Sequence, residues 1–293
     1  MMTRTLSILG AAALAVGIVA PCPAQFGGLI QKAQDKANQA QQRKKQAEQA
    51  RDIYTAWTPE QEQQVGEASA AKLINIFGLY DNPQMERYVN LVGAAVAQQA
   101  PRAVPYRFGI LDTDVVTALS LPGGYVFITR GALANMTTEA ELAGTLAHEV
   151  AHVDQRHLEK EIRSKDSMAF LKAQTATLYN STQLTQIAGT SVQGALTQQY
   201  SRDKESDADR LGVQFAAKAG YQPGGLRLFL TFLSQVPATP DSQRQLSLWG
   251  STHPPFPERI AALSVEEAKL PSTGQVLEAR FQQHVNPAAF TGP

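Results

Sequence analysis

The chain has 293 residues, of which 43% are hydrophobic, so it is long enough and apolar enough to build a buried core. Lysine plus arginine and aspartate plus glutamate number 26 each, which excludes a strong overall field for nucleic acid or for an acidic membrane surface. No nucleic-acid partner is expected, and any partner must be sought at a localised site.

The N-terminus is typical of a secretory signal peptide, which we place at residues 1–24. Arg4 precedes an apolar run over residues 6–20 that is too short to span a bilayer comfortably, and small residues follow it. Cleavage would discard Cys22, the only cysteine. The competing interpretation is a lipoprotein anchored through Cys22, but Pro21 stands where a small residue is normally needed. Both interpretations export the chain, and we expect the periplasm.

Residues 25–57 follow as a polar leader that is rich in glutamine, alanine and lysine. Such a segment can be helical but has little apolar surface to bury, so we expect an exposed leader helix or linker. The domain proper begins near Thr58, an expected N-cap with Pro59 at the first helical position. We place the folded domain at residues 58–272 and a C-terminal tail at residues 273–293.

Two strands and then a helix are expected in the middle of the chain. The segments YRFGILD and GGYVFIT read as strands around the turn LPGG. A capping box of Thr138 and Glu141 then predicts the start of a helix. On this helix Leu142, Leu146 and Val150 recur every four residues, which indicates one apolar face.

The same helix carries His148, Glu149 and His152 in a His-Glu-x-x-His motif. Histidines four positions apart differ by only about 40° in direction, so both imidazoles can point at one ion, and zinc suits such a pair. Glu149 would hold the water without ligating and act as general base. The alternative is a polar helix with solvated histidines, which is disfavoured because the flanking residues are apolar and an unpaired buried Glu149 would be costly.

A third ligand is needed, because two protein ligands are too few for a catalytic zinc site. One class of zinc peptidase takes a histidine six residues after the second histidine, but that position holds Leu158 and His157 falls one residue short. We therefore interpret His157 as an exposed helix residue. The other class takes a glutamate from a later helix, where Glu205 and Asp209 lie four residues apart. Glu205 can ligate while Asp209 receives the second ring N–H of a ligand histidine.

Four segments together resemble one family: HEVAH, YSRDKESDADRLG, LPGGYVFITRGAL and STHPPFPERI. From about Thr58 to Leu263 the chain resembles the membrane-associated zinc metallopeptidase family of the Ste-type CAAX prenyl endopeptidases, HtpX and periplasmic BepA-like proteases. The resemblance implies an α+β, mainly helical gluzincin-type domain with a small sheet whose edge strand borders the active-site cleft. It implies one Zn²⁺ per chain and the following site residues: His148, His152 and Glu205 as ligands, Glu149 as base, and Asp209 behind them.

His253, in STHPPFPERI, is a further candidate catalytic residue. A catalytic zinc keeps its fourth position open, so a loop histidine would either bind there and close the site or hydrogen-bond the developing oxyanion. A surface turn set by Pro254 and Pro255 is the third interpretation. We favour the gate, because a broad, backbone-reading protease needs some restraint on its activity.

The segment from Ala173 to Ser201 contains no charged residue and joins the two ligand helices. We interpret it as a mobile helical lid, with Gly189 and Gly194 as hinges. Ordinary helix packing is an equal alternative, and contact with a membrane surface is a weaker one, since basic residues are lacking.

These features favour an exported zinc endopeptidase that hydrolyses internal peptide bonds of misfolded or misassembled cell-envelope proteins. We expect GGYVFIT, residues 123–129, to be the edge strand to which an unfolded substrate adds as one more strand. Peripheral contact with the membrane or with envelope assembly proteins is a further expectation. The alternative is a zinc-containing chaperone of the envelope that holds clients without cleaving them, but the intact base and ligand set favours the enzyme.

Overall fold

The structure is a computed structural model that describes residues 34–43, 56–165, 181–197, 200–253, 256–285 and 290. The chain divides into two units, Met1–Tyr54 and Thr55–Pro293. In the first unit, residues 34–43 form a helix whose residues are all exposed. The expected signal peptide, with Cys22, lies outside the described residues.

Two capped helices open the second unit. Helix α2 (Pro59–Phe77) begins with the predicted N-cap, since Thr58 accepts a hydrogen bond from the backbone N–H of Gln61, whose side chain in turn accepts one from the Thr58 N–H. Asn82 caps α3 (Pro83–Ala97) in the same way, through a side-chain oxygen that accepts a backbone N–H. Short polar side chains thus set where both helices start.

A three-stranded sheet follows, made of β1 (Arg107–Leu111), β2 (Ala118–Leu121) and β3 (Tyr125–Thr129). The strand order is β1-β3-β2, with β1 parallel and β2 antiparallel to β3. The expectation that residues 123–129 form the edge strand is therefore wrong. The tight turn η1 (Pro122–Gly124) folds β3 directly back on β2, and β1 pairs with the other side of β3, so β3 is central and β2, the strand before the turn, is an edge strand.

The turn η1 requires its two glycines. Gly123 and Gly124 have φ of 73° and 87°, in the region where only glycine is unstrained. Glu62 of α2 accepts a hydrogen bond from Gly123 N at 3.3 Å and one from Arg102 Nη2 at 2.6 Å. A buried carboxylate therefore holds the turn against the first helix.

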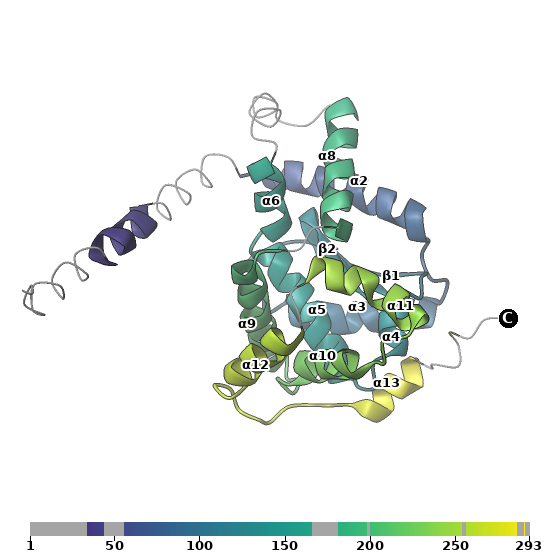
Figure 1. Cartoon of the computed structure of the whole chain (residues 1–293). Coiled ribbons are helices and arrows are strands. Elements are labelled where there is room, and N and C mark those ends of the chain that lie inside the picture. The colour runs from purple at the N-terminus through teal and green to yellow at the C-terminus, as the bar shows by residue number, and fades with distance from the viewer. Residues whose placement is uncertain are drawn as a thin grey trace, which may run out of the picture. The chain divides into compact units, whose positions relative to one another are not determined.

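The two faces of the sheet pack against different helices. Figure 1 shows the sheet between α2 and α8 (Ser181–Thr197) on one side and α3 and α5 (Glu139–Asp154) on the other. Side chains alternate between these faces along each strand, as the period of two requires. Phe108, Ile110, Ala118, Val126 and Ile128 belong to the apolar cluster with α3 and α5, whereas Leu111, Leu119, Leu121 and Phe127 belong to that with α2 and α8.

Helix α5 is buried along its whole length. It starts with the predicted capping box of Thr138 and Glu141. It packs most extensively against α9 (Arg202–Lys218). The two helices approach closely at Gly212, where a Cβ would lie 2.9 Å from both Cα and N of His148. The backbone of the motif helix thus touches the helix that carries Glu205.

The remaining helices surround this pair and confirm the mainly helical α+β class. They are α4 (Arg130–Ala134), α6 (His157–Lys165), α10 (Gly225–Gln235), α11 (Pro240–Thr252), α12 (Phe256–Glu267) and α13 (Glu278–His284). Helix α10 packs against α5 and α12, and α12 against α9. Helix α13 packs against α3 and α5 and buries Phe281, so the second half of the chain closes around the motif helix.

Candidate active site

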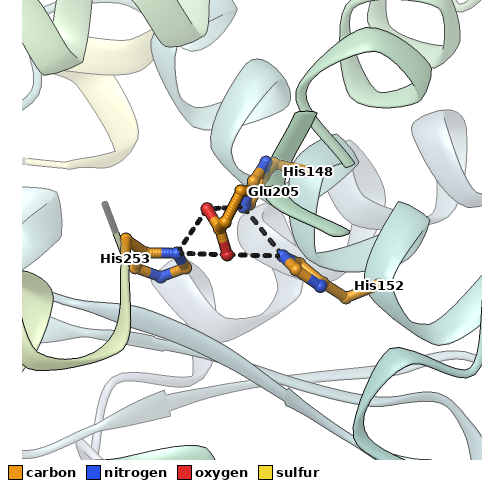
Figure 2. A group of neighbouring side chains, drawn as sticks. All are labelled: His148, His152, Glu205 and His253. Atoms are coloured by element: carbon orange, nitrogen blue, oxygen red, sulfur yellow. Dashed lines mark hydrogen bonds and ion pairs between the residues drawn. The ribbon is translucent and has the colours of Figure 1, made fainter. Parts of the chain in front are cut away.

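His148 and His152 lie one turn apart on α5, and both are buried. Their Nε2 atoms are 3.0 Å apart, and the two rings converge with Glu205 and His253 on one point (Figure 2). The i, i+4 spacing on a helix produces this convergence directly. Two imidazole nitrogens are thereby offered to a single ion.

Glu205 reaches the histidine pair from the first turn of α9. Its Oε2 lies 3.7 Å from His148 Nε2, and its Oε1 lies 3.4 Å from His152 Nε2. Burial by itself would raise the pKa of this carboxyl, but the neighbouring His253 and Arg259 hold it well below its usual range. Glu205 is therefore a buried, ionised carboxylate and a candidate ligand.

His253 completes the group from the chain just after α11. Its Nδ1 lies 3.0 Å from each carboxylate oxygen of Glu205, and its side chain is 3% exposed. One nitrogen or oxygen from each of the four side chains lies within 4.8 Å of all the others. The structure thus brings His253 into contact with the candidate ligands and not onto a surface turn.

The donor set fits a tetrahedral metal ion. Atoms bound at about 2.0 to 2.1 Å around a tetrahedral zinc lie about 3.4 Å apart. The distances that join His148, His152 and Glu205 run from 3.0 to 3.7 Å. Two nitrogens and a carboxylate are also the ligand types of catalytic zinc sites that keep a fourth position open. Geometry and chemistry therefore agree on a candidate metal centre.

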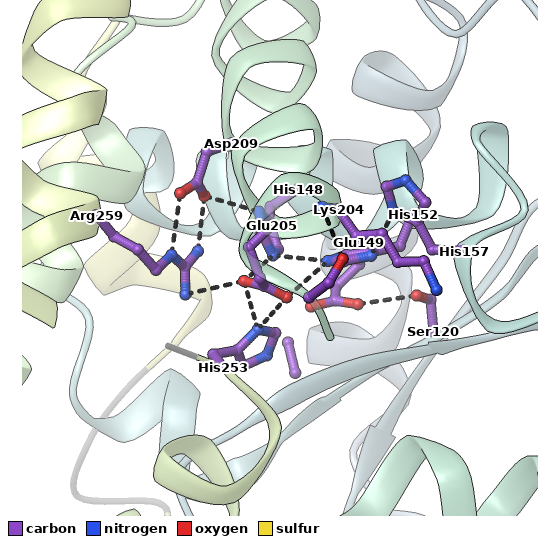
Figure 3. A network of polar contacts seen from close by, with 12 residues as sticks. Ser120, His148, Glu149, His152, His157, Lys204, Glu205, Asp209, His253 and Arg259 are labelled. Atoms are coloured by element: carbon purple, nitrogen blue, oxygen red, sulfur yellow. Dashed lines mark hydrogen bonds and ion pairs between the residues drawn. The ribbon is translucent and has the colours of Figure 1, made fainter. Parts of the chain in front are cut away.

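Asp209 contacts His148, and Arg259 contacts Glu205, from outside the cluster of four side chains (Figure 3). Asp209 Oδ1 lies 3.0 Å from His148 Nδ1, the ring nitrogen that faces away from the cluster. Arg259 of α12 donates to Asp209 through Nε at 3.0 Å and Nη2 at 2.7 Å. Burial opposes the charge, but Arg259 and His148 lower the pKa of Asp209 to about 2. Asp209 is thus an ionised carboxylate within ion-pair distance of the outer nitrogen of His148, in the place expected for the acceptor of that ring.

Glu149, the candidate base, is held by the edge strand. Ser120 of β2 donates a hydrogen bond from Oγ to Glu149 Oε2 at 2.9 Å (Figure 3). The other oxygen, Oε1, is buried and has no hydrogen-bond partner among the described residues. Ser120 therefore holds one of the two carboxylate oxygens of Glu149.

His157 is buried, so its interpretation as an exposed helix residue is wrong. Helix α5 ends at Asp154, and Arg156 has a φ of 53°, so α6 starts in a new direction and brings His157 back to the site. His157 Nδ1 lies 2.9 Å from His152 Nδ1. Burial, together with His152 and Lys204, lowers the pKa of His157 to about 2, which keeps its ring neutral.

Comparison with known proteins decides the family. The model of peptidase family M48 matches residues 81–267, which is more than half of the chain. The chain belongs to peptidase family M48. The enzyme class expected from the sequence, a zinc metalloendopeptidase with a His-Glu-x-x-His helix, is thereby confirmed at the level of the family.

Several M48 relatives are similar over part of their length. The chain is 31% identical over 193 residues to a putative beta-barrel assembly-enhancing protease of Vibrio cholerae, covering 60% of this chain and 38% of that protein. It is 31% identical over 159 residues to the metalloprotease YcaL of Escherichia coli, covering 53% and 59%. It is 32% identical over 154 residues to the mitochondrial metalloendopeptidase OMA1 of Schizosaccharomyces pombe, covering 52% and 43%. The chain thus spans less than two thirds of the length of these relatives.

Ser120 and Arg259 were not identified from the sequence as parts of this M48 site, and His157 was misplaced on the surface. Ser120 carries a weak signal: it is a polar residue two positions after Ala118 in a short apolar strand, and the strand period of two places both residues on the α5 face. His157 carries none, because its contact depends on the turn at Arg156. Among the described helices of this M48 chain, none has the length and apolar character needed to cross a membrane.

Proposed function

We propose that the chain is an active zinc endopeptidase that hydrolyses internal peptide bonds. The observation that carries this proposal is the convergence of His148, His152 and Glu205 on one buried point, with the Glu149 carboxylate beside them. Zinc held by the three ligands would polarise the peptide carbonyl and lower the pKa of a water toward about 7.

Glu149, Ser120 and Asp209 have separate roles in the proposed reaction. Glu149 takes the proton of the attacking water and passes it to the leaving amine, the usual task of a positioned carboxylate. The hydrogen bond from Ser120 holds one of its oxygens, and the other, which has no hydrogen-bond partner among the described residues, would be the one that accepts the proton. Asp209, backed by Arg259, sets the ring of His148.

The substrate strand is proposed to add to β2 and not to β3. A polypeptide paired with the outer edge of β2 would lie beside Ser120, which touches the base. Helix α8 packs against β2 and also against α11, which leads to His253. We therefore propose α8 as a lid that moves when substrate binds; Gly189 and Gly194 lie within this continuous helix, so it would move as a unit.

His253 is proposed to gate the metal. Its contact with both oxygens of Glu205 supports a place in the fourth ligand position, where it would close the site to water. Withdrawal of His253 would then open the site. Stabilisation of the oxyanion is the competing role, and the two differ in the sign of the effect on cleavage when the side chain is removed.

The relatives named beta-barrel assembly-enhancing proteases suggest the setting. We propose that this chain cleaves misfolded or misassembled proteins of the cell envelope and contacts envelope assembly proteins. We propose export to the periplasm through residues 1–24, with anchoring through Cys22 as the alternative form of export.

The test is Glu149→Gln in the full chain. We expect one zinc per chain in both proteins, and a loss of casein cleavage by about 10² to 10⁴-fold in the variant, because the carboxylate moves protons and does not ligate. Bound zinc is measured by metal analysis and cleavage with a fluorescent casein, each with and without a chelator. Wild-type protein that binds zinc but leaves casein intact would support a chaperone, and cleavage that survives the chelator would exclude zinc from the reaction.

A further inference from the structure

The connection between α5 and α6 places a third histidine beside the metal ligands. In a continuous helix, a residue five positions after His152 would point about 140° away from it. Here α5 ends at Asp154, and Arg156 takes the left-handed conformation, with a φ of 53°. Arg156 is held there by hydrogen bonding of its guanidinium to Trp57 O at 3.2 Å. This anchored turn returns His157, the first residue of α6, to His152.

Two contacts fix the ring of His152. Its Nε2 faces the other ligands, 3.0 Å from His148 Nε2, while its Nδ1 lies 2.9 Å from Nδ1 of His157. The ring of Tyr200 stacks on it, with centroids 4.3 Å apart and planes 22° apart. The hydrogen bond limits rotation within the ring plane, and the stacking limits rotation out of it.

The proton positions follow from the chemistry of imidazole. A metal at Nε2 of His152 uses that lone pair, so the ring proton must lie on Nδ1. Nδ1 of His157 then has to accept this proton, and it can do so only while its own ring is neutral and protonated at Nε2. A protonated His157 would oppose N–H to N–H across 2.9 Å.

We propose that His157 is the positioning residue of the metal ligand His152. By accepting the Nδ1 proton it selects the tautomer whose Nε2 faces the ion, the part that Asp209 plays for His148. The two ligands thus have different acceptors, a carboxylate paired with Arg259 and a neutral imidazole. This inference rests on the proposed function, since it needs a metal at the site.

A neutral acceptor suits the charge of the site. Three carboxylates already face the cluster or its ligands: Glu149, Glu205 and Asp209. Arg259 balances part of this charge from within the same buried region. A fourth carboxylate at position 157 would add a buried negative charge, whereas an imidazole orients His152 without one.

The test compares two substitutions of His157, one that keeps a hydrogen-bond acceptor near His152 Nδ1 and one that removes it. His157→Asn keeps an acceptor, because the Asn Oδ1 is the same number of bonds from Cα as the His Nδ1. His157→Leu keeps burial and removes the acceptor. The zinc dissociation constant is measured by chelator competition on the full chain, and thermal unfolding of the metal-free proteins reports on packing. His284→Leu, an exposed histidine on α13, is the control.

We expect zinc affinity to fall by about 10 to 100-fold in His157→Leu and to stay within a few-fold of wild type in His157→Asn and His284→Leu. If His157→Leu fails to fold without metal, His157→Ala takes its place in the comparison. Wild-type affinity in the Leu or Ala variant, or an equal loss in the Asn variant, overturns the positioning role. A wild-type protein that binds no zinc instead overturns the proposed function together with this inference.

Discussion

The histidines of the site differ in how firmly the chain holds them. His148 and His152 project from a helix that is buried along its whole length, and their outer nitrogens face Asp209 and His157. His253 instead follows the end of α11 and meets the cluster through Glu205. A side chain on a connection between helices can withdraw without unfolding a helix, whereas His148 and His152, which lie inside α5, cannot.

For His253→Ala we expect normal zinc binding, because His148, His152 and Glu205 remain, and cleavage of unfolded casein at a rate equal to or above wild type. The reason is that the gate would no longer compete with water for the fourth position. Initial rates at saturating substrate and bound zinc measure the two effects. A fall in kcat of tenfold or more would instead assign His253 to the oxyanion.

The site depends on the close contact of two helices. Glu205 comes from α9 and the histidines from α5, so the distance between these helices sets the distances between the candidate ligands. Gly212 is the residue that allows the approach, because a Cβ there would lie 2.9 Å from backbone atoms of His148. Backbone atoms cannot move aside as the end of a long side chain can.

For Gly212→Ala we expect α9 to shift away from α5 and to carry Glu205 with it. The free energy of unfolding should fall by about 1 to 3 kcal/mol, as for other overpacked positions, and zinc affinity should fall as well. Denaturant unfolding of the metal-free protein and chelator competition measure the two losses.

Gly189→Ala is the matched control for Gly212→Ala. Gly189 also lies inside a helix, α8, but a Cβ there would meet Lys72 Nζ at 3.5 Å, an ordinary contact. Alanine should stabilise that helix by about 0.5 to 1 kcal/mol without changing zinc affinity. Equal effects of the two substitutions would contradict the role assigned to the α5–α9 contact.

At the scale of the molecule, a second polar cluster joins distant parts of the chain. Glu139, in the first turn of α5, accepts hydrogen bonds from Tyr88 Oη of α3 at 2.8 Å and from Tyr221 Oη at 2.7 Å. It also pairs with Arg280 of α13. One buried carboxylate thus ties the motif helix to an early helix and to the C-terminal helix.

For Glu139→Gln we expect the free energy of unfolding at pH 7 to fall by about 1 to 3 kcal/mol, since a charged acceptor of three donors is lost. Burial opposes the charge, but Arg280, Tyr221 and Tyr88 lower the pKa of Glu139 below its usual 4.5. The contribution is therefore complete above about pH 4.5 and is lost as the pH falls through the lowered value. Denaturant unfolding of the metal-free wild type and variant at pH 7 and pH 3 measures the gap, which should shrink at low pH. A gap that is the same at both values would show that the charge is not what stabilises the cluster.

Local sequence was enough to predict the features that depend on neighbours along the chain. Thr58 and Thr138 start their helices as expected, because a capping box needs only a side chain and a backbone three residues apart. The convergence of His148 and His152 follows from the pitch of a helix, and the spacing of Glu205 and Asp209 follows from the same rule. The mainly helical class and the family could also be predicted from such local motifs.

Tertiary structure decided what depends on pairing between segments. Which strand lies at the edge is set by where β1 pairs. β1 pairs with the side of β3 to which we had expected the substrate to add. The burial of His157 is set by one backbone angle at Arg156, which residue propensity does not favour. Contacts of the Arg156 side chain with Trp57 and with Glu62 of α2 hold this conformation in place. Ser120 meets Glu149 because the sheet face lies on α5. A single sequence carries no direct record of such long-range contacts, because they arise from the packing of whole elements and not from the order of neighbouring residues.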